Sequence, residues 1–142
     1  MGDLTKDFSA WEFECHCGCG QRHISPLLVA GAQSLRDRID GPVTVTSGYR
    51  CPRHPVEAGK EPSEKASFHV LGFAFDWYAP GLSLVEMLYH ALHVPAFYNG
   101  GIGLYPEAKF LHCDLGDGDL RRWARVNGVY VSMEQGLREI GK

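Results

Sequence analysis

The sequence predicts an α+β fold in which a small antiparallel sheet is flanked by helices. Segments with apolar residues at helical spacing alternate with short runs of β-branched and aromatic residues, an order typical of mixed α+β chains. The dipeptide Asn127-Gly128 separates two of the short runs, as in a tight antiparallel hairpin. No linker-like stretch divides the 142 residues, so we expect a single domain over residues 1–142.

Helix signals define the first third of the chain. Ser9 and Glu12 have the spacing of a capping box, which predicts a short helical turn directly after Ser9. Ser25-Pro26 supplies an N-cap and a first-turn proline. Apolar residues then recur at helical spacing, at Leu28, Ala32, Leu35 and Ile39. We therefore expect a helix that begins at residue 26 and is stopped by Gly41.

Two strands, a loop and a helix are predicted in the middle of the chain. Residues 42–47 alternate β-branched and polar side chains, and residues 71–78 combine small and aromatic ones; both patterns indicate strands. Residues 51–66 contain three prolines and mixed charges, which indicates a long surface loop. Ser83 and Glu86 form a second capping box, so a helix is expected to follow it.

The last third contains two further strands, a hairpin and a short helix. Residues 102–105 and 110–115 are apolar and β-rich, and a proline-containing turn joins them. Beyond them, Asn127-Gly128 marks the predicted hairpin. Ser132 and Gln135 are placed to cap a short final helix.

Composition excludes several classes of protein. The chain is 44% hydrophobic and 22% charged with a formal net charge of -3, so electrostatic capture of nucleic acid is not expected. Its apolar runs are far shorter than the roughly 18 residues that a membrane span needs. No basic start followed by an apolar core is visible at the N-terminus, so we expect synthesis in the cytoplasm without a signal peptide.

Three residues form a candidate metal site. His69 and Asp76 lie seven residues apart in SFHVLGFAFD, and His112 lies in FLHCD. Two imidazoles and one carboxylate suit a zinc ion that keeps its fourth position for water. Since His112 belongs to a different predicted strand, it would close the site from the other side. The residue types alone make this a hypothesis that needs structural context.

Several ordered motifs resemble those of one enzyme family. Ser67, His69, Gly72, Ala74 and Asp76 fit the pattern SxHxxGxAxD, which resembles the hallmark of the M15-type zinc peptidases, the D-Ala-D-Ala carboxypeptidases and murein endopeptidases. SGYR at residues 47–50 and GGIGLYP followed by FLHCD at residues 100–114 resemble two further signatures. FSAWEF near the start and RRW at residues 121–123 are similar to the short phage- and bacterium-borne branch. The resemblance covers roughly residues 8–125.

The resemblance implies a fold, an activity and roles for individual residues. The fold would be of the hedgehog/DD-peptidase type, with a zinc site on the open face of the sheet. His69, Asp76 and His112 would bind zinc, and a zinc-activated water would hydrolyse a peptide bond in peptidoglycan stem peptides or cross-links. Arg50 would hold the substrate carboxylate or the developing oxyanion, as suits a forked, always-charged guanidinium. Ser67 would support the substrate side of the site by hydrogen bonding.

The general base is the least defined part of this expectation. Some family members place an acidic residue three positions before the last zinc histidine, where this chain has Lys109, and others place a histidine two before it, where this chain has Phe110. Asp114 lies two residues after His112, and strand residues two apart share a face. Asp114 is therefore expected to act either as the base or as a residue that orients a zinc ligand.

The cysteines leave three interpretations open. Three of the five thiols alternate at Cys15, Cys17 and Cys19, and Cys51 directly follows the SGYR motif. The four could hold a structural metal ion, although CxCxC lacks the usual two-residue spacing of zinc knuckles. Cys15 or Cys17 could instead form a disulfide with Cys51, or all could be ordinary reduced thiols. Cys113 is expected to face away from His112 into the core.

Two functions of other classes stay open beside the hydrolase. One is a zinc-bearing module that binds murein or protein without turnover, and the other is a structural phage or prophage protein in which the motif is a relic. The expected route to the cell wall or periplasm is delivery by phage or prophage machinery. The sequence leaves the cleaved bond (D,D, L,D or L-Ala-D-Glu) and the oligomeric state undefined.

Overall fold

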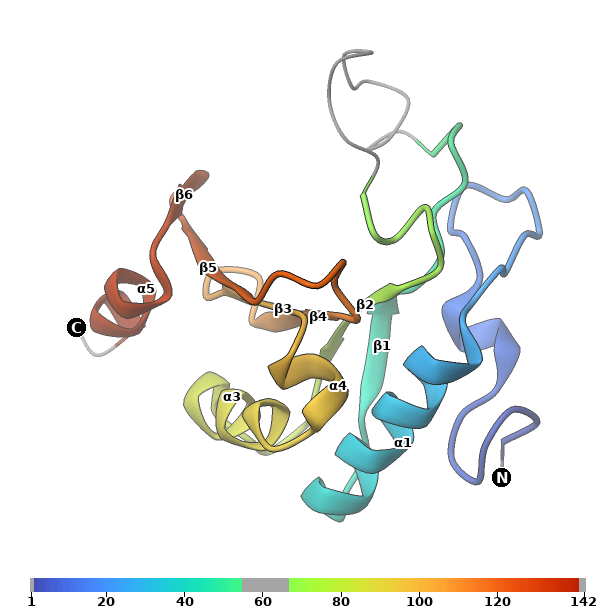
Figure 1. Cartoon of the computed structure of the whole chain (residues 1–142), viewed down its shortest axis with the longest axis horizontal. Coiled ribbons are helices and arrows are strands. Elements are labelled where there is room, and N and C mark those ends of the chain that lie inside the picture. The colour runs from blue at the N-terminus through green and yellow to red at the C-terminus, as the bar shows by residue number, and fades with distance from the viewer. Residues whose placement is uncertain (1, 55–66, 141–142) are drawn as a thin grey trace.

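The computed structural model describes residues 2–54 and 67–140 and shows one mixed sheet with helices packed against it (Figure 1). The predicted α+β class is confirmed at this level. The sheet has six strands in the order β1-β2-β4-β3-β5-β6, with the bounds β1 Thr44–Ser47, β2 Ala74–Tyr78, β3 Gly101–Tyr105, β4 Phe110–Asp114, β5 Arg121–Val126 and β6 Val129–Val131. None of the helices in the described part of the chain is long and apolar enough to cross a lipid bilayer.

The sheet departs from the predicted antiparallel arrangement at the pairing of β3 with β5. These two strands run parallel, whereas the other described pairs are antiparallel. β4 already has β2 on one side and β3 on the other, so β5 adds to the free edge of β3. Because the chain reverses after β3 and again after β4, β5 runs in the same direction as β3.

The N-terminal elements follow the capping signals. The 3₁₀ turn η1 (Ala10–Phe13) begins after Ser9, whose backbone N–H donates to the Glu12 carboxylate over 2.7 Å. Helix α1 (Pro26–Ile39) begins after Ser25, whose hydroxyl accepts from the Leu27 N–H. It ends at Asp40, which adopts the left-handed conformation (φ 52°) one residue before the expected stop. Both predicted elements are confirmed.

The strand predicted over residues 71–78 begins later than expected. β2 starts at Ala74 because the preceding residues form turns: the Gly72 N–H donates to the His69 carbonyl and the Phe73 N–H to the Phe68 carbonyl. Gly72 has a positive φ of 75°, and a Cβ there would lie 2.4 Å from the His23 carbonyl oxygen. Only glycine fits this turn. The loop predicted over residues 51–66 lies mostly in 55–66, outside the described residues.

The remaining helices cover one face of the sheet. α3 (Leu84–Leu92) begins with the predicted Ser83–Glu86 capping box, and α5 (Met133–Ile140) is the predicted last helix. α4 (Pro95–Tyr98) was not predicted, because four residues are too few for a periodic pattern. Helices α1, α3 and α4 lie together on one side of the sheet (Figure 1), where they enclose the main core with side chains such as Leu28, Phe75, Trp77, Phe97 and Leu111. The opposite face carries polar side chains together with aromatic ones such as Trp123.

The predicted hairpin is also confirmed. β5 and β6 pair antiparallel around Asn127 and Gly128, which both have positive φ values, 52° and 78°. This is the conformation that a two-residue hairpin loop requires and that Asn-Gly adopts readily. The hairpin extends the sheet beyond β3, so that β5, which carries Arg121 and Trp123, is separated from β4 by β3 alone.

Candidate active site

The open face of the sheet carries two rows of side chains that cross several strands. One row runs Asp76, His112, Gly103 and Trp123, and the next runs Ala74, Asp114, Gly101 and Arg121. Residues two apart on a strand point to the same face, so the rows share one surface. Cys113, between them in the sequence, points the other way and accepts a hydrogen bond from the Trp77 indole over 3.3 Å. The expected core position of Cys113 is confirmed.

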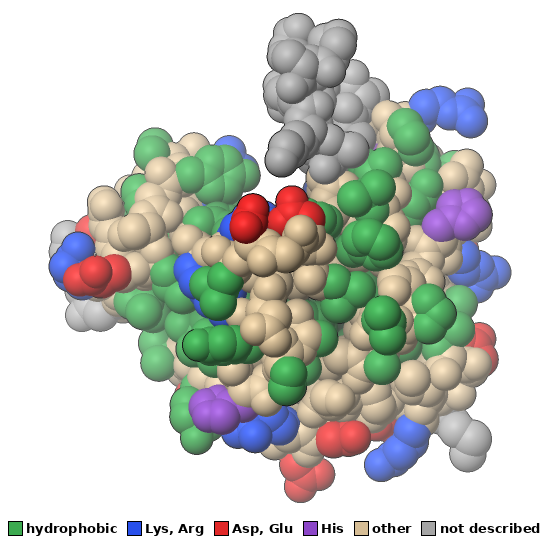
Figure 2. All heavy atoms as spheres, in the orientation of Figure 1, with side chains coloured by type: hydrophobic (Ala, Val, Ile, Leu, Met, Phe, Trp, Pro, Cys, Tyr) green, Lys and Arg blue, Asp and Glu red, His purple; other side chains and the backbone are tan. Residues whose placement is uncertain are grey.

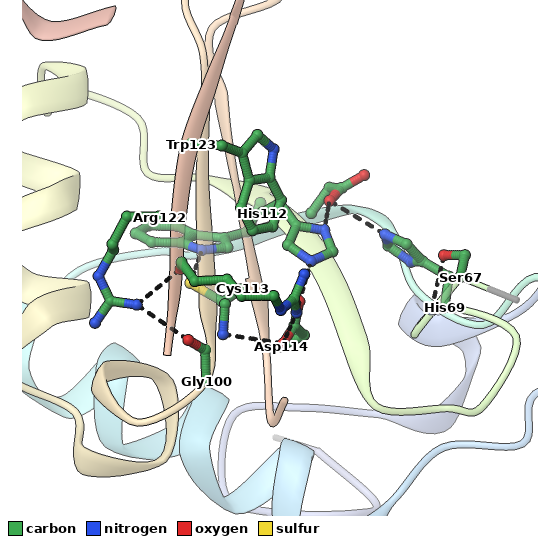
Figure 3. A network of polar contacts seen from close by, with 12 residues as sticks. Ser67, His69, Gly100, His112, Cys113, Asp114, Arg122 and Trp123 are labelled. Atoms are coloured by element: carbon green, nitrogen blue, oxygen red, sulfur yellow. Dashed lines mark hydrogen bonds and ion pairs between the residues drawn. The ribbon is translucent and has the colours of Figure 1, made fainter. Parts of the chain in front are cut away.

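Asp76 lies between the two histidines. Its Oδ1 is 3.0 Å from His112 Nδ1 and 3.3 Å from His69 Nε2. His69 and His112 point toward one another (Figure 3), with ring centroids 5.1 Å apart. All three side chains are buried. The structure therefore brings the three predicted metal ligands together, and their ligand atoms lie within 4.8 Å of one another.

His69 is fixed by contacts outside the strands. It lies in the turn before β2, where its backbone N–H donates to the Ser67 hydroxyl over 3.1 Å. Its Nδ1 is 2.7 Å from the Gly48 carbonyl oxygen. Since a carbonyl only accepts, Nδ1 carries a proton, and Nε2 faces Asp76, where it donates when the ring is protonated and presents a lone pair when the ring is neutral. Ser67 thus stabilises the turn that carries His69. The sequence predicted that Ser67 forms a hydrogen bond in the site but did not specify this partner.

Arg50 reaches the same carboxylate from the segment after β1. Its Nη2 is 3.3 Å from Asp76 Oδ2, and its Nε donates to the Ser47 hydroxyl over 3.3 Å. The Arg50 backbone N–H donates to the His69 carbonyl, which ties this segment to the histidine turn. The guanidinium is thereby held at the edge of the cluster, as the resemblance implied for a group that meets negative charge.

Asp114 is buried under the histidine. Its Oδ2 is 2.7 Å from His112 Nε2, and both of its oxygens accept from Arg121 Nη2 over 2.7 Å. The Gly101 N–H donates to Oδ1 over 3.0 Å. Asp114 is 0% exposed. Both carboxylate oxygens of Asp114 therefore accept hydrogen bonds from groups inside the protein. The bond to Nε2 orients the His112 ring so that Nδ1 faces Asp76.

Two glycines of β3 make these contacts across three strands possible. A Cβ at Gly101 would lie 2.5 Å from both the Asp114 carboxylate and the Arg121 guanidinium, and one at Gly103 would lie 2.4 Å from the Trp123 ring. Without side chains on β3, Asp114 reaches Arg121, and the His112 and Trp123 rings approach to 5.1 Å. Glycine within a strand often marks such a close approach. That signal was present in GGIGLY and could have indicated the role of Arg121, which sequence reasoning missed.

The charges of the cluster shift its pKa values. Burial disfavours the ionised carboxylate of Asp76, but the His69 charge and hydrogen bonds from both histidines hold its pKa well below the usual range. Burial also opposes protonation of His112, yet its bonds to Asp114 and Asp76 raise its pKa to about 9. Burial lowers the pKa of His69. A metal ion that binds here must displace the proton from His112, because an imidazole ligand is neutral.

The donor set suits zinc. Two imidazole nitrogens and a carboxylate oxygen converge, and a hydrogen bond from the opposite ring nitrogen fixes each imidazole. Such backing of histidine ligands by a carbonyl or a carboxylate is the usual arrangement around zinc. Three protein ligands leave a fourth position open, which is typical of catalytic rather than structural zinc sites. The residues present therefore fit the metal that the resemblance implies.

A pocket of about 1020 Å³ lies over this cluster. The proposed metal ligands, Arg50 and Ser67 belong to its lining. Aromatic residues of the β3–β6 side also line it, namely Tyr105, Phe110, Trp123 and Tyr130, together with charged residues such as Glu107, Asp117 and Arg125. In Figure 2, acidic side chains lie beside the notch between the β5–β6 side and the N-terminal side of the molecule. The pocket therefore offers both a charged floor and apolar walls for an extended ligand.

Lys109 and Phe110, which occupy the positions where the resemblance places a base, have other roles in this structure. Lys109 is exposed and has a positive φ of 59° at the turn before β4. The Phe110 ring stacks on Tyr105 at 4.5 Å. Glu107 and Asp117 are the exposed carboxylates among the described residues that line the pocket. The four clustered cysteines do not belong to the lining of this pocket.

Comparisons with known proteins identify relatives that are peptidoglycan endopeptidases. A family model described as peptidoglycan L,D-endopeptidase MepK matches residues 26–123. The peptidoglycan L,D-endopeptidase MepK of Escherichia coli K12 is 34% identical over 84 residues, which are 58% of this chain and 43% of that protein. A probable peptidoglycan L,D-endopeptidase MepK of Haemophilus influenzae is 36% identical over 62 residues, 44% of this chain and 31% of that protein. The chain thus spans less than half the length of these relatives.

Proposed function

Because the chain belongs to the M15-type peptidase family of the peptidoglycan L,D-endopeptidase MepK, we propose that it is a zinc-dependent endopeptidase that cleaves peptide bonds in peptidoglycan. The substrate would be a stem peptide or a cross-link, and the bond an L,D bond like that in the name of its relatives. We regard residues 1–142 as one peptidase domain. Action at the cell wall follows from this substrate, and delivery by phage machinery stays a prediction.

The observation that supports this proposal is the convergence of His69, Asp76 and His112 at the floor of an open pocket. A purely structural site would be closed by a fourth protein ligand. Among the described residues, three ligand groups converge here, all three line the pocket, and Arg50 lies 3.3 Å from Asp76. A substrate in the pocket would therefore meet the metal position and a fixed positive charge together.

Zinc, when bound by these three residues, supplies a Lewis acid that makes a water molecule nucleophilic near neutral pH. The side chains of this protein perform the remaining tasks. Arg50 presents N–H donors at the pocket edge, where they can stabilise the negative charge that develops on the scissile carbonyl oxygen. The aromatic walls provide apolar surface for the peptide and hold water away from the reacting bond.

We propose a positioning role for Asp114. Its oxygens are occupied by His112, Arg121 and the Gly101 N–H, and it is shielded from solvent. Such a carboxylate sets the tautomer of His112 and strengthens it as a ligand. A general base would then be another group that faces the pocket, and Glu107 and Asp117 are the exposed carboxylates among the described residues that line it.

The test is hydrolysis of purified peptidoglycan, with mass spectrometry of the released fragments. Zinc-loaded protein should release fragments whose masses identify an L,D cut, and a chelator should stop the release. His69→Ala should abolish it, whereas His93→Ala, an exposed histidine at the end of α3, should not. Glu107→Gln and Asp117→Asn should differ, and the base is the one whose loss reduces kcat.

Other outcomes would point to a different function. If zinc binds stoichiometrically but no fragment is released from several murein types, the protein is a zinc-bearing binding module. Lys109 and Phe110 at the usual base positions favour that second candidate. If the protein binds no metal at His69, Asp76 and His112, both the peptidase and the zinc module are wrong.

A further inference from the structure

Four thiols converge at a place outside the lining of the proposed active-site pocket. The thiol cluster comprises Cys15, Cys17, Cys19 and Cys51, and the four sulfur atoms lie within 4.8 Å of one another. Cys17 Sγ is 3.5 Å from Cys15 Sγ and 3.3 Å from Cys51 Sγ. Four thiolates around one zinc ion, with Zn–S bonds of about 2.3 Å, have sulfur atoms about 3.8 Å apart. The cluster therefore already has nearly the size of a zinc tetrathiolate site.

The backbone around the cluster is shaped to aim the sulfur atoms inward. Gly18 and Gly20 have positive φ values of 90° and 75°, and a Cβ on either would meet nothing within 4 Å. The need for glycine here is therefore conformational. The Cys15 N–H donates to the Gln21 carbonyl over 2.8 Å and closes the loop. This tight turning explains how alternate cysteines, without the usual two-residue spacing, come to face one point.

Backbone N–H groups also point at the sulfur atoms. The Cys51 N–H donates to Cys15 Sγ over 3.3 Å, and the Gln21 N–H donates to Cys19 Sγ over 3.4 Å. Such donors stabilise negative charge on sulfur, and hydrogen bonds of this kind support metal-bound thiolates. A neutral thiol that merely fills a core gains little from them.

The cluster lacks a core of its own. The buried residues Cys15, Tyr49 and Cys51 form a small group separate from the main core, whereas Cys17 and Cys19 are exposed. A group this small contributes little hydrophobic stabilisation. The loop from Cys15 to Gln21 contains no described helix or strand. Something other than apolar packing must hold this loop against Cys51, and a metal ion would do so.

We propose that the thiol cluster binds one structural zinc ion through all four cysteine sulfurs. Four protein ligands complete a tetrahedral shell and leave no position for substrate, which distinguishes this site from the site of His69, Asp76 and His112. A single disulfide would join only two of the sulfurs and would not account for the convergence of the other two on the same point. Because Cys51 follows Arg50 directly, the ion would tie the N-terminal segment to the chain that presents Arg50. This proposal is independent of the proposed peptidase activity.

The experiment measures zinc in the full-length chain purified under reducing conditions. The wild-type protein should contain about two zinc ions per chain. The single variant His69→Ala and the double variant Cys17→Ser/Cys19→Ser should each contain about one. Cobalt substituted into His69→Ala should show strong thiolate-to-metal charge-transfer absorption and bands typical of a tetrahedral tetrathiolate. Cys113→Ala is the matched control, since Cys113 lies in the core away from the cluster, and it should keep both ions.

Each alternative has its own result. Zinc content unchanged in Cys17→Ser/Cys19→Ser, or no thiolate absorption in the cobalt-loaded His69→Ala protein, would overturn the proposal. So would titration of only three free thiols instead of all five in the unreduced, denatured chain, because that result identifies a disulfide. If Cys17→Ser/Cys19→Ser fails to fold, the cobalt spectrum of His69→Ala decides alone.

Discussion

Two clusters of side chains that we propose as metal ligands are held together in different ways. In the strand cluster, His69, Asp76 and His112 are placed by the sheet and the turn before it, and each histidine is braced by a further protein group. In the thiol cluster, three of the four cysteines lie in one irregular loop whose turns depend on glycine. The first cluster is placed by strands and by a hydrogen bond to each histidine, whereas the second depends on a few hydrogen bonds within and beside one loop.

The difference indicates how each cluster depends on metal. A braced site is already formed before the ion arrives, so the ion adds chemistry more than structure. A site made by a loop without a core gains its structure from the ion, as in small zinc domains. We therefore expect loss of the strand-site metal to remove activity, and loss of the thiol-site metal to open the N-terminal segment.

The largest effect is expected from removing a ligand of the strand cluster. Asp76→Ala should lower kcat/KM for peptidoglycan more than about 1,000-fold, beyond the roughly 10–100-fold typical of residues that only orient ligands. Asp76 contacts both histidines and Arg50, so its loss removes one metal ligand and the charge that holds the other groups. Initial rates from fragment release measure the change.

Cys17→Ser/Cys19→Ser provides the matched comparison for Asp76→Ala. It should retain measurable hydrolysis but become sensitive to limited proteolysis near its N-terminus, which Asp76→Ala should not. Equal losses of activity in the two proteins, with equal protease resistance, would contradict the division of roles between the clusters.

The second largest effect tests whether the hydrogen bond between Asp114 and His112 is needed for metal binding at the strand cluster. Asp114→Asn preserves shape but can donate its amide N–H to His112 Nε2, now 2.7 Å from Oδ2. That donation would leave the His112 proton on Nδ1, where the metal must bind. Zinc affinity should fall about 10–100-fold. Competition with a zinc-binding dye measures it, and Asp117→Asn, a carboxylate outside this network, should leave the affinity unchanged.

A smaller effect is expected at the residue that lies between the clusters. Arg50→Lys keeps the charge beside Asp76 but loses the fork that also donates to the Ser47 hydroxyl. We expect kcat/KM to fall about 10-fold while both zinc ions stay bound. A fall confined to KM would assign Arg50 to the substrate carboxylate, and a fall confined to kcat would assign it to the oxyanion. An unchanged kcat/KM would remove Arg50 from the site.

The sequence could predict those parts of the fold and site that are encoded locally. Capping boxes at Ser9 and Ser83 and the pair Asn127-Gly128 identified their elements, because each signal acts over a few residues. Residue types and the resemblance pointed to His69, Asp76 and His112, and the structure brings these three side chains together. The parallel pairing of β3 with β5 was not predictable, since it depends on β4 being occupied on both sides.

Contacts across the sheet were the parts that the sequence left undefined. The role of Asp114 stayed open because its partner Arg121 lies two strands away and reaches it only over Gly101. The Gly48 carbonyl that braces His69 is a backbone group with no residue signal. The cysteines stayed ambiguous because their spacing alone does not show the turns at Gly18 and Gly20.

The smallest effect is expected from a substitution at the N-cap of α3, which should lower the stability of the fold without touching either cluster. Ser83→Ala should cost about 1 kcal/mol of unfolding free energy, because the hydroxyl caps α3 by accepting from the Glu86 N–H over 3.1 Å. Urea unfolding measures it. Zinc content should stay at the wild-type value, which separates a general loss of stability from the specific losses above.

The same cap predicts a pH dependence. Hydrogen bonds from the Ser83 backbone and side chain lower the pKa of Glu86 below its ordinary value. The folded state therefore binds this proton less readily than the unfolded state, so the contribution of Glu86 to stability is complete above the ordinary pKa and is lost as pH falls through the lowered one. Glu86→Gln should flatten the acid limb of the stability curve while both zinc ions remain bound at neutral pH. A curve parallel to the wild type in acid would show that the carboxylate of Glu86 does not stabilise α3.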